Sequence, residues 1–153
     1  MAALIEYEEG CPILVSHFTK LISWPARLAP VLLVALTACA GDETLSAYGA
    51  AGKTWRLSQI DGAPFSAAAT LEFPAPGKIA GQAPCNAYRA ETTAPYPWFD
   101  TTGLSSTRKV CPELLEETRF LEALQTMGEA EVTGDVLILR NGSGREMLFR
   151  ADG

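Results

Sequence analysis

Apolar residues alternate with polar ones along much of the chain and change to a helical period in one segment, residues 112–128. There they recur at steps of three and four, which is typical of an amphipathic helix with one buried face. Pro112 suits the first turn of such a helix, and Gly128 suits its end. The sequence therefore predicts one helix over about residues 112–128, with a buried stripe of Leu114, Leu115, Thr118, Leu121, Leu124 and Met127.

The alternating segments on both sides of this helix are short and are separated by turn-forming pairs such as Asp61-Gly62 and Gly134-Asp135. Short strands joined by tight turns favour an antiparallel sheet over the parallel sheet of an α/β enzyme. We therefore expect a mainly β fold: a small antiparallel rolled sheet or barrel-like domain with the helix packed on it. The expected strands cover residues 54–60, 69–73, 78–81, 96–99, 103–107, 129–133, 136–140 and 145–150.

An uncharged apolar stretch, residues 28–37, lies ahead of this domain and follows Lys20 and Arg27. About 10 apolar residues are too few to span a bilayer as a helix, but they fit the apolar core of a secretory signal. The stretch ends in Leu36-Thr37-Ala38-Cys39, which is similar to a bacterial lipobox and implies cleavage before a lipid-modified Cys39. An ordinary signal that contains a Cys, or a buried apolar strand, are the alternatives.

This interpretation divides the chain into a signal peptide (residues 1–38), a flexible Gly/Ala-rich tether (39–52) and a folded domain (53–153). Glu6, Glu8 and Glu9 fit a basic signal start poorly, so we expect that translation begins at Val15. Enteric bacteria retain lipoproteins with Asp after the lipidated Cys in the inner membrane. Ala40 therefore implies an outer-membrane anchor, with the domain facing the periplasm.

Removal of the signal would leave no histidine, because His17 is the one histidine of the chain. Histidine-dependent catalytic constellations are thereby excluded, and we expect no catalytic residue, metal site or cofactor. Glu116 and Glu117 point about 100° apart on a helix, so we interpret them as a solvated face rather than paired acids. A net charge of −6 argues against nucleic acid as a partner.

Four cysteines are present, of which Cys11 would leave with the signal and Cys39 would carry lipid. Cys85 and Cys111 would then fold in an oxidising compartment, where two remaining thiols most often form a disulfide. A catalytic or metal-binding pair of thiols is the alternative, although no neighbouring residue in the sequence would lower a thiol pKa.

Four segments together resemble the META domain family of HslJ-like heat-shock lipoproteins: WRLSQIDGAP from residue 55, GQAPCNAY from residue 81, SSTRKVC from residue 105, and residues 137–149. Pro84 departs from the family glycine before Cys-Asn, and Lys109-Val110 departs from Met-Ala. The resemblance implies a mainly antiparallel β fold with one helix, residence in the cell envelope, and a link to heat-shock and antibiotic stress. It brings no established catalytic residue.

Five residues are candidates for binding. Asn86 could contact a ligand, although an Asn at such a place more often holds a turn. Thr107 and Arg108 could receive an anion, or could be an exposed strand end. Tyr96 and Trp98 lie among prolines and could form the rim of a groove, or could fill the core.

Three functions are therefore open. The first is a non-enzymatic envelope lipoprotein that contacts the membrane through its lipid and binds other envelope components under stress. The second is a small-ligand binder with a barrel mouth near Tyr96 and Trp98. The third is an enzyme, for which the mature chain has neither a histidine nor a free thiol. A filled barrel would favour the first function, a deep apolar pocket the second, and acidic residues converging in a cleft the third.

Overall fold

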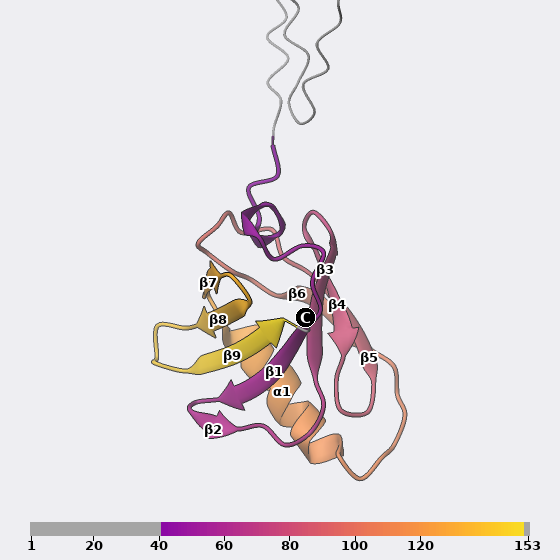
Figure 1. Ribbon diagram of the computed structural model, residues 1–153. Coiled ribbons are helices and arrows are strands. Elements are labelled where there is room, and N and C mark those ends of the chain that lie inside the picture. The colour runs from indigo at the N-terminus through magenta and orange to yellow at the C-terminus, as the bar shows by residue number, and fades with distance from the viewer. Residues whose placement is uncertain (1–40, 152–153) are drawn as a thin grey trace, which may run out of the picture. The chain divides into compact units, whose positions relative to one another are not determined.

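The computed structural model describes residues 41–151, which form an antiparallel sheet curled into a half-barrel around one side of a helix (Figure 1). The strand order is β6-β5-β4-β3-β1-β9-β8-β7, and β2 pairs with β1 beside this path. The mainly β prediction with one helix is thus confirmed for the described residues. The elements are η1 (Leu45–Tyr48), β1 (Trp55–Ile60), β2 (Ala63–Pro64), β3 (Thr70–Ala75), β4 (Lys78–Gln82), β5 (Ala87–Glu91), β6 (Thr102–Ser106), α1 (Leu114–Thr126), β7 (Glu129–Thr133), β8 (Val136–Arg140) and β9 (Glu146–Ala151).

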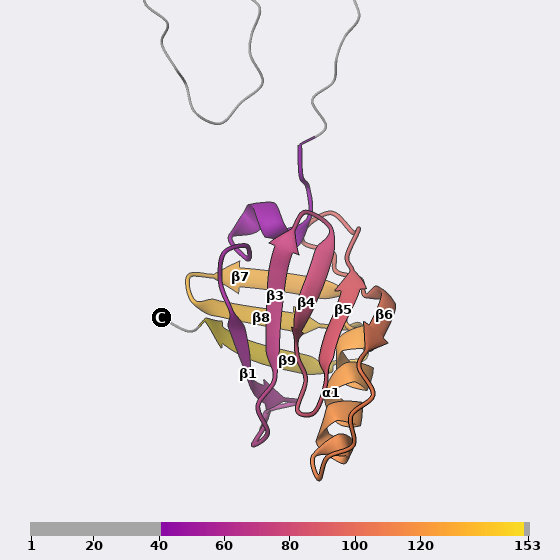
Figure 2. The same cartoon turned by 90° about the vertical axis from the view of Figure 1, so that its right-hand side faces the viewer.

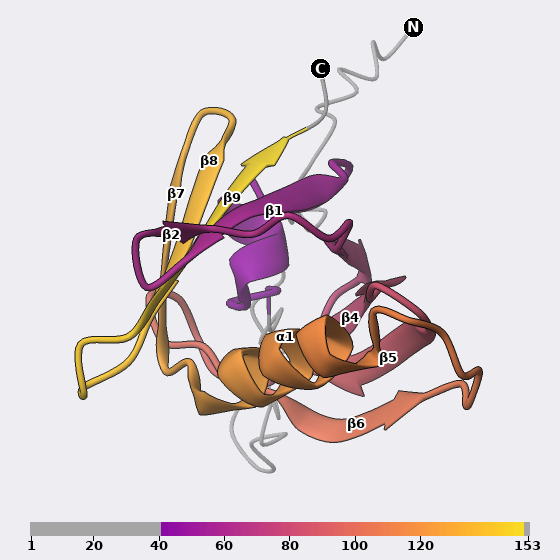
Figure 3. The ribbon, with the colours of Figure 1, turned by 90° about the horizontal axis from the view of Figure 1, so that it is seen from below.

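The two halves of the sheet face each other, with β3, β4 and β5 crossing the direction of β7, β8 and β9 (Figure 2). Strand β1 joins the halves, because it pairs with both β3 and β9. Seen from below, α1 lies along the side that the curled sheet leaves open (Figure 3). The helix therefore completes the enclosure that the strands begin.

Side chains fill the space between the sheet and the helix. Trp55 is fully buried, and its indole Nε1 donates a hydrogen bond to the carbonyl oxygen of Ala50 at 2.8 Å. Alternate residues of β3, β5, β8 and β9 point inward, as the two-residue period predicts. The largest buried apolar side chains include Trp55, Ile60, Leu71, Ile79, Phe120, Leu124, Leu137, Leu139, Met147 and Phe149.

The helix confirms the predicted element but presents a different face to the core. Its buried residues are Glu117, Phe120, Ala123 and Leu124, followed by the buried Met127 just after the helix. Leu114 and Leu115, which were expected in the buried stripe, are instead exposed to 43% and 79%. Thr118 is exposed as well, and Glu117 and Phe120 take the buried positions. The buried face is therefore rotated about the helix axis relative to the predicted stripe.

Two strand predictions need correction. Residues 96–99 form a single bridge, Trp98 to Glu129, rather than a strand, because Pro95 and Pro97 have no N–H for a ladder. Strand β5 (Ala87–Glu91) was not predicted, although Tyr88 and Ala90 point inward and alternate with exposed neighbours. The predicted hairpin around Gly134-Asp135 is confirmed, with Thr133 paired to Val136.

The C-terminal part of the expected flexible tether, residues 45–52, belongs to the folded domain. Residues Leu45–Tyr48 form the 3-10 helix η1, and the side chains of Leu45 and Ala50 are buried in the core. Small residues such as Ala50 do not make this segment flexible, because they allow it to pack closely against the sheet. The expected signal peptide, the Val15 start and the lipidated Cys39 lie outside the described residues, within which no helix is long and apolar enough to span a membrane.

Candidate functional site

The disulfide between Cys85 and Cys111 is present, with the two Cα atoms 6.0 Å apart. It joins the segment before β5 to the segment before α1. The Glu113 carboxylate lies within 4.8 Å of both sulfur atoms, but a disulfide offers no thiolate to a metal ion. The predicted pairing is therefore confirmed, and the described residues have no free cysteine.

Glu117 on α1 points its carboxylate at the backbone next to this disulfide. Its Oε2 accepts hydrogen bonds from the Cys85 N–H at 2.9 Å and the Asn86 N–H at 2.7 Å, and its Oε1 accepts from Asn86 Nδ2 at 2.8 Å. Successive backbone N–H groups of this kind form a concave anion site. Here the protein's own carboxylate fills that site, so the prediction of a solvated Glu117 is wrong.

Asn86 uses all four hydrogen-bonding positions of its side-chain amide inside the protein. Its Oδ1 accepts from the Thr107 hydroxyl and from the Lys109 N–H, each at 2.7 Å. Its Nδ2 donates to the Lys109 carbonyl at 3.2 Å and to Glu117. An amide with two donors and two acceptor positions has none left for a ligand, so the geometry favours the turn-holding interpretation.

We call these residues the Asn86–Glu117 cluster: Cys85, Asn86, Thr107, Lys109, Cys111 and Glu117. The structure brings together in it three of the predicted elements, the disulfide, Asn86 and Thr107. Arg108 lies beside the cluster with its side chain exposed to solvent. The cluster can fix two loops and the start of the helix, but its polar groups are already paired with one another.

Gly81 and Tyr88, which belong to the same sequence motif, pack against Thr70 on β3. A Cβ atom on Gly81 would lie 2.1 Å from the Thr70 carbonyl oxygen, so any other residue would push β3 and the end of β4 apart. The Tyr88 hydroxyl donates to that same oxygen at 2.8 Å. Burial raises the pKa of the Tyr88 hydroxyl, and the negative charge of Glu72 adds to this effect. Tyr88 is therefore a core residue whose hydroxyl links β5 to β3.

Three aromatic residues lie at the end of the domain that carries η1, and we call them the aromatic end: Tyr48, Tyr96 and Trp98. The Tyr48 and Tyr96 rings stack with centroids 4.5 Å apart, and the Tyr96 N–H donates to the Glu43 carbonyl at 2.8 Å. Tyr48 is 50% exposed and Trp98 is 55% exposed. Trp98 thus stays outside the core, whereas Tyr96 is partly buried and packs against the edge of the core. Tyr48 was missed because its segment was assigned to the tether.

The loop that carries Tyr96 and Trp98 is held in shape by Asp100. The Asp100 Oδ1 accepts hydrogen bonds from the Thr93 N–H at 2.6 Å and the Ala94 N–H at 2.9 Å, and the two threonine hydroxyls before Ala94 add two more. Burial alone would raise the pKa of Asp100, but these hydrogen bonds outweigh it and hold the pKa below its usual value. The exposed Trp98 and the partly buried Tyr96 therefore extend from an ordered loop.

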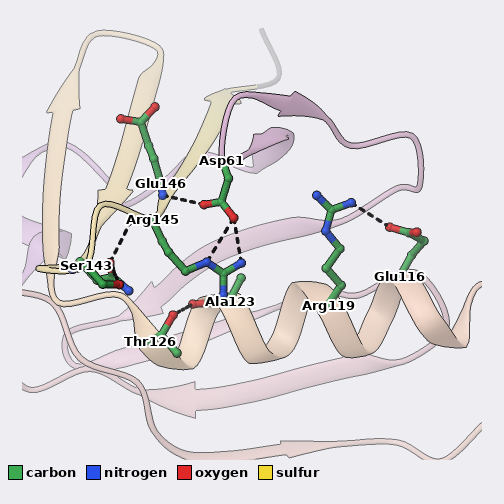
Figure 4. Close-up of polar contacts among 9 residues, drawn as sticks. Asp61, Glu116, Arg119, Ala123, Thr126, Ser143, Arg145 and Glu146 are labelled. Atoms are coloured by element: carbon green, nitrogen blue, oxygen red, sulfur yellow. Dashed lines mark hydrogen bonds and ion pairs between the residues drawn. The ribbon is translucent and has the colours of Figure 1, made fainter.

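A second polar cluster joins two hairpins elsewhere in the domain, where the β1–β2 turn meets the β8–β9 loop (Figure 4). Arg145 donates to Asp61 Oδ2 through Nε at 3.1 Å and through Nη2 at 3.0 Å, and the Glu146 N–H donates to Oδ1. The Arg145 hydrogen bonds and the Glu146 N–H lower the pKa of Asp61. Both Asp61 and Gly62 have positive φ, as a two-residue hairpin turn requires, so this cluster braces the turn.

Hollows that open to solvent lie along the strands of the described residues. One of 280 Å³ is lined by residues 87–89 and 105–107, and another of 420 Å³ lies over Ile79 and Ala90. The core side chains that face the interior leave little accessible area. A further hollow of 540 Å³ brings two acidic residues together, Glu113 and Glu116. Glu116 also contacts Arg119 at 3.7 Å.

Comparisons with known proteins agree with this architecture. The META domain family matches residues 48–153. The NMR structure of a protein from Burkholderia xenovorans is 19% identical over 84% of this chain and 94% of its own, with a TM-score of 0.58. The crystal structure of a DUF4847 family protein from Bacteroides vulgatus is 13% identical over 70% of this chain and 96% of its own, also with a TM-score of 0.58. These identities show a shared fold alone, and no curated protein matches the chain significantly.

Proposed function

The chain belongs to the META domain family, and on this basis we propose that it is a non-enzymatic, lipid-anchored protein of the cell envelope that binds other envelope components through its outer surface. The observation that carries the proposal is the filled interior of the half-barrel. A lipocalin-like binder needs an internal cavity for its ligand. Because side chains occupy that space here, binding is assigned to the outside.

One stretch of the outer surface has the composition of a binding site. Val110 is 90% exposed and Leu115 is 79% exposed, and Leu114 is exposed beside them. Arg108 and Lys109 add positive charge to the same stretch. Exposed apolar side chains that gather in one place are typical of interaction surfaces, so we assign residues 108–115 to the partner. The Asn86–Glu117 cluster and the disulfide would hold this segment in a fixed shape.

The envelope location rests on the sequence ahead of the domain and on the disulfide. We propose that Cys39 carries lipid in the outer membrane and that the domain faces the periplasm, where the Cys85–Cys111 bond can form. The family resemblance supports a role in heat-shock or antibiotic stress. Replacement of Cys39 by Ser should abolish the incorporation of labelled lipid, and lipid in the Ser variant would contradict the anchor.

The partner is tested by a photo-crosslinking amino acid at position 110 of the full chain, expressed in its own host with and without stress. The matched control places the same amino acid at Asp135, which is exposed on the β7–β8 turn. We expect a discrete adduct with an envelope component from position 110 and none from position 135. Folded protein that gives the same adduct pattern from both positions would contradict a binding surface at residues 108–115.

A further inference from the structure

The chain is fastened to the folded domain very soon after the expected anchor. The Glu43 carbonyl accepts the hydrogen bond from Tyr96, and Leu45 is already buried in the core. Four residue steps separate Cys39 from Glu43, and a fully extended chain spans at most about 14 Å over that length. The polar layer of one leaflet is roughly 5–8 Å thick. A lipid on Cys39 would therefore hold this end of the domain close to the bilayer.

The end that is held there carries the side chains that suit a membrane interface. Tyr48 and Trp98 are half-exposed, and Tyr96 stacks on Tyr48 beside the Glu43 attachment. Tyrosine and tryptophan are enriched at the level of the lipid headgroups, because their rings are apolar and their O–H or N–H groups stay hydrated. In both side views, η1 and the loop between β5 and β6 lie at one end of the domain, and α1 begins at the other (Figures 1 and 2).

We propose that the aromatic end rests in the membrane interface and orients the domain, so that residues 108–115 face away from the bilayer. This inference rests on the proposed lipid at Cys39, which supplies the anchor, while the rings supply the orientation. Asp42 and Glu43 place negative charge at the same end. The contact therefore depends on the aromatic rings and not on attraction to anionic lipids, and neutral vesicles should suffice for it.

The expected mature chain carries its own reporter, because its two tryptophans are the buried Trp55 and the exposed Trp98. The purified full-length mature protein, with its lipid verified by mass, is reconstituted into neutral phosphatidylcholine vesicles. Some vesicles carry bromine high on the acyl chains, and others carry it near the chain ends. We expect bromine near the headgroups to quench much of the Trp98 emission, and deep bromine to quench less.

Three variants control the measurement. W98F leaves Trp55 alone, and its emission should be insensitive to brominated lipid. Y48S removes a neighbouring ring and should reduce the quenching of Trp98, whereas V110S removes an exposed apolar side chain at the other end and should leave it unchanged. Equal responses of wild type and W98F, or of Y48S and V110S, would overturn the inference.

The remaining outcomes separate this inference from the proposed function. A mature protein without lipid on Cys39 would overturn both. A lipidated protein in which brominated lipids leave Trp98 emission unchanged would overturn the orientation and leave the anchor standing. Trp98 emission that responds to the protein-to-lipid ratio, and not to bromine, would assign the aromatic end to a second copy of the chain and also overturn the membrane contact.

Discussion

At the scale of single residues, the Glu117 carboxylate is buried and holds the loop before β5 through hydrogen bonds. It is 5% exposed and pairs with three N–H donors of Cys85 and Asn86. Glu117→Ala would leave these donors without a partner, and each buried unpaired group costs roughly 1–3 kcal/mol. We expect urea unfolding of residues 40–153 to show a loss of about 3–5 kcal/mol.

The neighbouring Glu116 is the matched control for this measurement. It is partly exposed and contacts Arg119 at 3.7 Å, so Glu116→Ala should change the free energy of unfolding by about 0.5 kcal/mol or less. Equal losses in the two variants would show that Glu117 does not support the loop.

Asp100 is expected to make the aromatic loop sensitive to acid. Its pKa lies below the usual carboxyl value near 3.8, because the loop hydrogen bonds outweigh the effect of burial. A carboxylate with a lowered pKa contributes stability above its ordinary pKa and loses that contribution as the pH falls through the folded value. The protection of the Thr93 and Ala94 amides, taken relative to their intrinsic exchange rates at each pH, should therefore fall below about pH 4.

Asp100→Asn keeps the shape of the side chain and removes its titration. In this variant, the protection of the Thr93 and Ala94 amides should no longer depend on pH in this range. Identical pH profiles for the variant and the wild type would exclude Asp100 as the titrating group.

At the scale of elements, α1 shows which part of the helix a pattern can predict. The period and the limits follow from the spacing of leucines, but the rotation about the helix axis does not. That rotation is set by contacts distant in sequence, namely the Glu117 bonds to Cys85 and Asn86, and the Phe120 ring against Tyr88. Adjacent glutamates look alike in a sequence, so the buried one could not be chosen in advance.

The face of α1 is tested by two truncations of apolar residues. Phe120 is fully buried and Leu115 is 79% exposed. Phe120→Ala should lower the free energy of unfolding by roughly 3–5 kcal/mol through loss of burial and formation of a cavity, whereas Leu115→Ala should change it by about 0.5 kcal/mol or less. Chemical denaturation decides between this face and the predicted stripe, which contains Leu115 but not Phe120 and would make the Leu115 loss large.

The disulfide was predictable from cysteine counting together with the expected export, and its contribution acts mainly on the unfolded chain. Cys85 and Cys111 are 26 residues apart in sequence, and closing a loop of this size contributes roughly 3–4 kcal/mol in the chain-entropy model. The double variant C85A/C111A should lose roughly 2–5 kcal/mol and keep the far-ultraviolet spectrum of the sheet. A melting curve unchanged from that of the wild type would contradict this role.

Most strands could be predicted from the sequence, but strand β5 and the contact between Asn86 and Glu117 could not. Alternation located β1, β3, β4 and β7 to β9 to within a few residues, because each buries one face. Strand β5 went unrecognised, since its two inward residues follow the Cys-Asn pair directly and form a very short pattern. The turn role of Asn86 could be expected from its residue type, whereas its partner Glu117 comes from 31 positions away.

At the scale of the whole molecule, the filled half-barrel makes a prediction about small ligands. The native domain should not take up an apolar dye such as anilinonaphthalene sulfonate, because the residues that face the interior already pack against one another. A fluorescence titration of the folded protein checks this. Saturable, stoichiometric binding by native protein would revive the small-ligand function and would weigh against binding by the outer surface.

The hydrogen bond from Trp55 to Ala50 has a mechanical consequence. Leu45 and Ala50 belong to the core, and Ala50 is bonded to Trp55. The segment from Leu45 to Ala50 is therefore packed directly against the sheet. A pull on a lipid at Cys39 would reach the core within a few residues. Under such load η1 would detach before any strand, so that Leu45 would be uncovered first and the indole of Trp55 would lose its hydrogen bond to Ala50 next.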